Sequence, residues 1–410
     1  MKKLLVLLII TTLVPVVLAA PLNSNRYYVY SKNLILKGMV GVQHEFPKAF
    51  STELNSFQVK LLKSLGVKIE PVRKFHVIGV LIPKGKPVCG DGKAHPSEQC
   101  GEPGLPDCPE GYVCENCKCV EGSTPSRTCY PDSHKPWGII KVNGGSGGAG
   151  VKVAVLDTGV YTDHLDLKSN IVDCKDTTKR GIKKGCADGN GHGTHVSGTI
   201  LANGGSDGLG IYGVAPEAKL MAIKVCGNSG ICWGDDIAKG IYYAADKGAN
   251  IISMSLGGNE PDPQILSAID YAVAKGVLIV AAAGNDGPAE GSIDYPGAYV
   301  KVIAVGAIDS DENVPKWSSR GTNDGDYIIE EKEVEFSAPG VSIESTYKDG
   351  CYVYMDGTSM ATPHISGLAA KLWQGSASAT RDYLHEIAKD IWFAGDDPAT
   401  GFGLPIAPYL

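Results

Sequence analysis

One stretch of sequence decides the fold, Gly357-Thr358-Ser359-Met360-Ala361-Thr362-Pro363-His364. A strand-like run precedes it, and a helix pattern of small and apolar residues follows it. A serine at the start of a helix is usually a cap, but Thr358 could cap this helix equally well. Proline within a helix pattern is tolerated only where its missing N–H costs little, as at Pro363. If Ser359 opens the helix, its hydroxyl faces outward beside its own backbone N–H, which suits a nucleophile with an oxyanion donor.

A nucleophilic serine needs a base, and the base needs a group that orients it. Two other stretches supply candidates. Residues 151–156 form an apolar run that is typical of a buried strand, and the carboxylate of Asp157 follows it directly. The sequence Gly191-His192-Gly193-Thr194-His195 places histidines at the start of a helix pattern. Spacing alone does not decide whether His192 or His195 is the base.

In the order Asp, His, Ser, these motifs resemble those of the subtilisin-like serine proteases, the subtilase family. The resemblance runs from about residue 136 to the C-terminus. It implies a serine endopeptidase that cleaves proteins through an acyl-enzyme, with Ser359 as nucleophile, His192 as base and Asp157 as the orienting carboxylate. Because the family carries its base on the first histidine, His195 is expected to be structural.

Two rival functions differ in class. One is a catalytically inactive binding protein on a subtilase fold, which the intact Asp157, His192 and Ser359 disfavour. The other is an acid-acting serine-carboxyl relative, which uses Glu and Asp in place of the histidine motif and Asn285.

A fourth motif is Ala281-Ala282-Ala283-Gly284-Asn285-Asp286-Gly287. An Asn-Asp-Gly string is usually only a turn. The resemblance implies instead that the Asn285 side chain donates to the oxyanion together with the Ser359 N–H. It also implies that the substrate backbone pairs along Ser255, Leu256, Gly257 and Gly258, with Gly230 on the opposite rim.

Strands alternate with amphipathic helices from residue 151 onward. Apolar runs at 151–156, 219–225, 251–255, 277–282 and 302–307 read as strands buried on both faces, and residues 235–247 and 263–275 read as helices. This alternation predicts a parallel sheet with right-handed crossovers and active residues at its carboxyl edge. The expected class is α/β, a three-layer subtilisin-like fold at residues 130–410, preceded by a small α+β prosegment and a Cys-rich module.

The N-terminal third has a different organisation. Residues 1–20 have a charged start, an apolar run and small residues at the end, which is typical of a cleaved signal peptide, although a membrane anchor is the alternative. Residues 21–88 resemble the family's propeptide, with strands at 27–30, 39–42 and 75–82 and a helix at 53–65. An unrelated N-terminal domain is the other interpretation. The resemblance implies a self-processing precursor whose prosegment assists folding and blocks the site.

Residues 89–129 hold seven cysteines among Gly, Pro and acidic residues, so cross-links must stabilise this module. Export favours disulfides over a zinc site, and the sequence does not choose the pairing. In the catalytic domain we expect Cys174 to pair with Cys186, Cys226 with Cys232, and Cys351 with Cys129.

A structural calcium ion is implied by the resemblance alone. Asp166 matches a calcium ligand of many subtilisins, and Asp207 lies in a loop that resembles the one completing that site. Calcium favours hard oxygen ligands on such loops.

The formal net charge of −7 argues against a nucleic-acid partner. No run after residue 20 is apolar enough to cross a membrane, so the mature protein is expected to be soluble. With the signal peptide, the expectation is a secreted, extracellular enzyme, and a monomer is expected.

Overall fold

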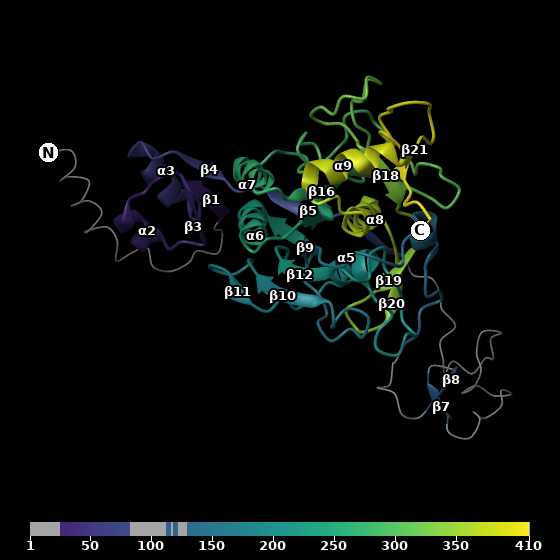
Figure 1. The fold of residues 1–410 in the computed structure, drawn as a ribbon. Coiled ribbons are helices and arrows are strands. Elements are labelled where there is room, and N and C mark those ends of the chain that lie inside the picture. Colours follow the sequence, from purple (N-terminus) through teal and green to yellow (C-terminus); the bar gives the residue numbers. More distant parts are fainter. Residues whose placement is uncertain (1–24, 83–111, 116–117, 122–128, 410) are drawn as a thin grey trace. The chain divides into compact units, whose positions relative to one another are not determined.

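The computed structural model describes residues 25–82, 112–115, 118–121 and 129–409. The expected signal peptide lies outside these residues, and so does most of the Cys-rich module. The described part of the module includes a hairpin of β7 (Tyr112–Glu115) and β8 (Lys118–Glu121). The chain divides into two compact units, Met1–Arg73 with Lys179–Lys183, and Lys74–Thr178 with Lys184–Leu410 (Figure 1).

The first unit is a small antiparallel sheet with two helices. Its strands, in the order β2-β3-β1-β4, are His44–Glu45, Phe50–Leu54, Asn25–Val29 and Ile69–Pro71. Helix α3 (Ser56–Ser64) begins with a capping box between Asn55 and Gln58. Buried Phe50, Leu54 and Leu62 join the sheet to this helix.

The prediction of a strand at residues 39–42 is wrong. Helix α2 (Leu34–Val40) contains the first half of that stretch, and Gly41 ends the helix. The Asn33 side chain accepts hydrogen bonds from the backbone N–H groups of Ile35 and Leu36, so a cap upstream of this stretch outweighs the strand preference of the valines.

The second unit contains an eight-stranded sheet in the order β11-β10-β12-β9-β14-β16-β17-β18, parallel from β10 to β18. This confirms the predicted α/β fold. The strands in that order are Lys183–Lys184, Ile171–Asp176, Lys219–Lys224, Lys152–Asp157, Ile251–Met254, Leu278–Ala282, Ile303–Ile308 and Phe336–Pro339. The outer strands β10 and β18 were not expected.

Helices cover this sheet. Helix α5 (His192–Leu201) packs against α8 (Thr358–Lys371), and α6 (Gly234–Asp246) packs against α7 (Pro263–Ala274) (Figure 1). Short α4 (Trp137–Lys141) and α9 (Ala377–Glu386) lie nearer the ends of the unit's chain. Helices α5 and α8 are buried along nearly their whole length, which explains their small residues.

The strand expected at 75–82 is interrupted. Residues 74–82, at the end of the stretch that resembles a propeptide, are grouped with the second unit. They form β5 (Lys74–Val77) and β6 (Val80–Ile82), which pair with different partners. Strand β5 lies between β13 (Ile231–Trp233) and β15 (Leu256–Gly257). Strand β6 pairs with β20 (Tyr352–Asp356), which also pairs with β19 (Ile343–Thr346).

Three disulfides are present in the described part of the catalytic region, and all three match the expected pairs. They are Cys174–Cys186, Cys226–Cys232 and Cys129–Cys351. A last pair of short strands, β21 (Ala388–Lys389) and β22 (Leu404–Pro405), closes the C-terminal segment. Among the described residues, no helix is both long and apolar enough to cross a membrane.

Candidate active site

Asp157 and His192 lie side by side in the buried interior. Asp157 is the last residue of β9, and His192 is the first residue of α5. The imidazole Nδ1 lies 2.9 and 3.0 Å from the two carboxylate oxygens of Asp157. The other ring nitrogen, Nε2, is buried and has no hydrogen-bond partner among the described residues. The carboxylate therefore fixes the ring and leaves Nε2 for proton transfer.

Asp188 holds the turn that begins α5, and the sequence motifs did not identify it. Its carboxylate accepts hydrogen bonds from the N–H groups of Gly191 and Thr194 and from the hydroxyls of Thr158 and Thr194. Burial acts to raise the pKa of Asp188, but these hydrogen bonds outweigh it and lower the pKa. The Asp188 carboxylate thus links Thr158, the residue after Asp157, to the helix that begins at His192.

Ser359 is the second residue of α8, and Pro363 lies four residues further along the helix. A proline at this position cannot donate to the Ser359 carbonyl. The hydroxyl of Ser255 takes over this role, because it donates to the Ser359 carbonyl at 2.8 Å. In return, Ser359 Oγ donates to the Ser255 carbonyl at 2.9 Å. The proline therefore couples the helix start to the strand that ends at Met254.

Asn285 lies just after β16 and next to the same helix start. Its side-chain oxygen accepts hydrogen bonds from the Thr358 N–H and the Thr358 hydroxyl, both at 3.1 Å. With the oxygen held in this way, the carboxamide NH2 is the end of the side chain left to donate to a ligand.

Strand β5 fills a groove between β13 and β15. Its register pairs Val77 with Leu256 and His76 with Gly257 on one side, and His76 with Ile231 on the other. The Val77 N–H donates to the Gly230 carbonyl at 3.0 Å. Residues 255–258 and 230, expected to bind a substrate backbone, therefore bind this segment of the chain itself as an added strand.

Both backbone polar groups of Ile78 contact Ser359. The Ile78 carbonyl oxygen accepts a hydrogen bond from the Ser359 N–H at 3.2 Å, and the Ile78 N–H donates to Ser359 Oγ at 3.0 Å and to the Ser255 carbonyl at 3.4 Å. At the next residue, a Cβ on Gly79 would lie 3.2 Å from His192 Nε2. The bond between Ile78 and Gly79 thus lies between the serine and the histidine.

A glycine is required at the helix start. Gly357 has φ +148°, and a Cβ there would lie 2.5 Å from the Ile78 carbonyl oxygen. Any side chain at this position would displace the peptide that the groove holds.

His195 and His364 are buried histidines with backbone partners. His195 Nε2 lies 3.0 Å from the Ile343 carbonyl oxygen and 3.2 Å from that of Val353, and His364 Nδ1 lies 2.8 Å from that of Met360. Burial lowers the pKa of His195 to about 3 and that of His364 to about 4. Both rings are neutral parts of the core, whereas His192 faces the carboxylate.

Comparison with known proteins agrees with this geometry. Residues 148–394 match the model of the subtilase family. The chain is a subtilase. It is 46% identical over 299 residues to a subtilisin of Bacillus sp. (strain TA39), covering 65% of this chain and 71% of the relative. It is 45% identical over 269 residues to an intracellular serine protease of Paenibacillus polymyxa, covering 63% of this chain and 79% of the relative.

Solved structures give the same family. The chain is similar to Sphericase, with 47% identity and a TM-score of 0.66, covering 68% of this chain and all of that one. It is similar to S41 Psychrophilic Protease, with 45% identity and a TM-score of 0.65 over the same shares. The subtilase is therefore a serine endopeptidase that acts on proteins.

The two expected calcium ligands of this subtilase lie in adjacent segments. Asp166 is fully buried and accepts hydrogen bonds from the Ile211 N–H at 2.9 Å and the Tyr352 hydroxyl at 2.6 Å. The loop of Asp207 passes over it, since a Cβ on Gly210 would lie 2.0 Å from an Asp166 carboxylate oxygen. Carboxylates and loop carbonyls are the hard donors that calcium takes, so the residues fit this ion in chemistry.

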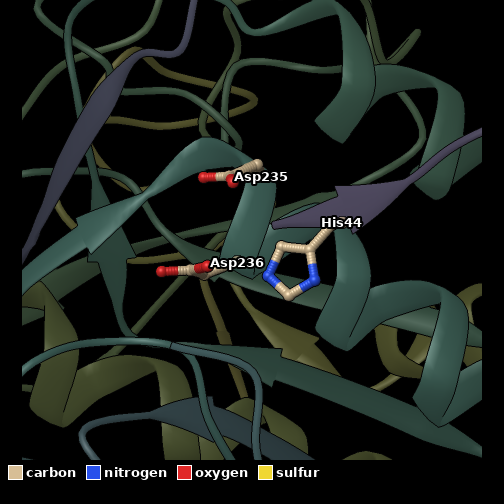
Figure 2. A group of neighbouring side chains, drawn as sticks. All are labelled: His44, Asp235 and Asp236. Carbon is tan, nitrogen blue, oxygen red and sulfur yellow. The ribbon is translucent and has the colours of Figure 1, made fainter. Parts of the chain in front are cut away.

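Other acidic residues in the subtilase have a simpler role. Asp235 and Asp236 lie in the first turn of α6 (Figure 2). Negative side chains stabilise a helix at this end, because the helix dipole is positive there. Figure 2 also labels His44, which belongs to β2 of the first unit.

Proposed function

We propose that Asp157, His192 and Ser359 are the catalytic triad of this endopeptidase. Ser359 Oγ attacks the carbonyl carbon of the substrate, and His192 Nε2 takes the hydroxyl proton and later gives it to the leaving amine. Asp157 keeps the imidazole in the required tautomer and stabilises its protonated form. Water then attacks the acyl-enzyme ester by the same route. Before attack the Ser359 hydroxyl has to rotate from the Ser255 carbonyl toward His192, and such contacts often tighten only in the reacting complex.

The oxyanion would be held by two donors. The Ser359 N–H already binds the carbonyl oxygen of Ile78, and the carboxamide NH2 of Asn285 is the second donor. Donors fixed before the reaction stabilise the developing charge without reorganising at the moment of attack.

The enzyme is a precursor that cuts itself, and the Ile78–Gly79 bond is its first substrate. The observation that carries this proposal is the Ile78 peptide, hydrogen-bonded to both the N–H and the Oγ of Ser359 while β5 lies in the groove as a strand. Until the cut, the same strand excludes other substrates, so the prosegment is also an inhibitor. The resemblance to the family's propeptide adds a folding role.

Export and a bound calcium ion complete the proposed function. The signal-like residues 1–20 and the disulfides support a secreted, extracellular enzyme that acts as a monomer on protein substrates. Asp166 and the Asp207 loop would hold a structural calcium ion away from the triad.

A fluorophosphonate probe tests the triad. The purified full chain should be labelled on Ser359 and should lose its prosegment, while Ser359→Ala should do neither. Ser366→Ala is the matched control, because its hydroxyl lies on the same helix but bonds Ser253. Labelling and processing in folded Ser359→Ala would exclude Ser359 as the nucleophile. An inert wild type with correct fold would favour the inactive binding protein instead.

A further inference from the structure

Asp294 lies beside the side chain that precedes the proposed cleavage bond. A Cβ on Gly257 would lie 2.5 Å from Ile78 Cδ1 and 2.6 Å from Asp294 Oδ2, so these two atoms are neighbours across that point. Both side chains are buried, with 8% and 6% of their surfaces exposed. The end of the Ile78 side chain therefore points toward a carboxyl group.

Glycines make the room for this carboxyl. A Cβ on Gly284 would lie 2.9 Å from Asp294 Oδ2, close to the distance found for the same atom at Gly257. Asp294 is fixed through its backbone, because its N–H donates to the Ala283 carbonyl at 2.7 Å and its carbonyl accepts from the Ala298 N–H at 2.8 Å. Asp294 thus places an acidic group between Gly257 and Gly284, and we refer to this region as the side-chain pocket of Ile78.

The charge of this group is not balanced by a neighbouring cation. Burial raises the pKa of Asp294 to about 7, and the negative charge of Asp286 acts in the same direction. Within the described residues, no lysine, arginine or histidine forms an ion pair with it. A cationic group brought by a substrate would offset the cost of the buried charge.

Chain length decides which substrate side chains can do this. Ile78 ends at its δ carbon, whereas the lysine ammonium lies two atoms beyond the δ carbon and the arginine guanidinium is equally extended. Arginine can also bind a carboxylate through two parallel hydrogen bonds. We infer that Asp294 is the specificity-determining residue of this pocket and selects proteins at lysine or arginine on the N-terminal side of the cleaved bond. This inference rests on the proposed function.

Because Asp294 titrates, the preference for a basic side chain should increase with pH. Above about pH 7 the carboxylate is charged and favours a basic side chain. Below that value it is neutral, and an aliphatic side chain such as that of Ile78 is accepted more readily. Asp286 is the other charged group that acts on Asp294, and its repulsion favours the neutral form at the lower pH.

Peptide anilides test the inference. We would use the processed wild type and Asp294→Asn at pH 9 on Phe-His-Val-X 4-nitroanilides, where X is Lys, Arg or Ile and the first three residues copy Phe75 to Val77. In the wild type, kcat/KM for Lys and Arg should exceed that for Ile by at least about tenfold, the ratio that a single partly buried charge pair supplies. In Asp294→Asn this preference should disappear while the Ile peptide is still cleaved. Glu290→Gln removes the same charge from the same loop at an exposed position and should keep the preference.

The outcomes separate this inference from the proposed function. Cleavage of the Ile peptide by both enzymes tests the catalytic residues, and only the Lys to Ile ratio tests Asp294. The same ratio in Asp294→Asn and wild type would overturn the inference. Circular dichroism confirms that the variant is folded, and Asp294→Ser, smaller and also neutral, replaces it if it is not.

Discussion

The Ile78 carbonyl oxygen accepts a hydrogen bond from the backbone N–H of Ser359 at 3.2 Å. In the proposed mechanism, an oxygen bound to this N–H lies where the negative charge of a tetrahedral intermediate would develop. The chain thus holds one of its own carbonyl groups on the backbone N–H of the proposed nucleophile.

Replacing Gly79 by proline should stop self-processing. The proline ring would crowd His192 Nε2 and the Met360 sulfur, each 3.2 Å from the Cβ position, and the bond to be cut would become a tertiary amide. We expect the precursor to accumulate, with processing at least about a hundredfold slower, a loss typical of misplacement at a reacting bond. Val80→Ala, an exposed neighbour, is the control. A wild-type product whose first residue is not Gly79 would show that another bond is cut.

Asn285→Leu should lower kcat by about 10²–10³-fold, the loss measured when the equivalent donor is removed from subtilisin, a member of this family. KM should change much less, because the donor acts mainly in the transition state. Glu290→Gln, exposed and in the loop that follows Asn285, should stay within about twofold in kcat. If kcat/KM falls by this factor only because KM rises, while kcat is unchanged, Asn285 acts in ground-state binding instead.

Acid should destabilise the catalytic unit through His195 and His364. Both pKa values are lowered on folding, so below about pH 6.5 the unfolded chain binds protons that the folded chain does not. Stability is therefore complete above this pH and falls by up to about 1.4 kcal/mol per pH unit for each ring, down to about pH 4.

Urea unfolding of Ser359→Ala, which cannot digest itself, measures this slope between pH 7.5 and 4.5. Adding His195→Gln should reduce the slope, although it also lowers the midpoint at pH 7.5 by weakening the bonds to Ile343 and Val353. A slope that is the same with and without His195 would assign the acid sensitivity to other groups.

Calcium removal should shorten the lifetime of the enzyme without changing its chemistry. An ion bound only by the folded state adds about 2.7 kcal/mol at a hundredfold excess over Kd. EGTA should therefore lower the thermal midpoint of inactive Ser359→Ala and shorten the half-life of the active enzyme at high temperature, and Asp207→Ala should imitate it. An initial rate that falls at once on chelation would place the ion in the active site, and an unchanged midpoint would rule out the site at Asp166.

Removal of the Cys174–Cys186 disulfide should cost roughly 3 kcal/mol, from the entropy of a loop of about a dozen residues. The double variant Cys174→Ser, Cys186→Ser should show this loss in urea unfolding of Ser359→Ala. Reduction of Ser359→Ala breaks all three disulfides and should lower the midpoint further. An unfolding midpoint that is the same in the double variant and in oxidised Ser359→Ala would contradict the prediction.

Much of this architecture could be predicted because its signals are local. Buried parallel strands appear as continuous apolar runs, and the motifs of Asp157, His192 and Ser359 each lie at the end of a strand or the start of a helix. These runs were enough to predict the parallel sheet. The outer strands β10 and β18 were missed because β10 is half-exposed and charged and β18 contains Pro339.

The functions of Asp188, Asp294 and Ile78 could not be predicted in the same way. Asp188 and Asp294 stand in sequences that read as ordinary polar loops, and their positions depend on segments far away in the chain. The interruption of the strand at Ile78 depends on Ser359, 281 residues later. The two halves of residues 75–82 pair with different strands, which depends on tertiary structure. The apolar pattern of these residues does not indicate it.

If the Ile78–Gly79 bond is cut as proposed, the pairing of β6 with β20 would limit how quickly that cut becomes permanent. The residues after Gly79 are anchored by this pairing and remain continuous with the catalytic unit, so the new amine cannot diffuse away. A tethered reactant has an effective concentration in the millimolar range or above. The amine would therefore compete with water for the acyl-enzyme and rejoin the chain. Formation of the active enzyme would then depend on how fast β6 separates from β20, which would delay release after the bond is cut.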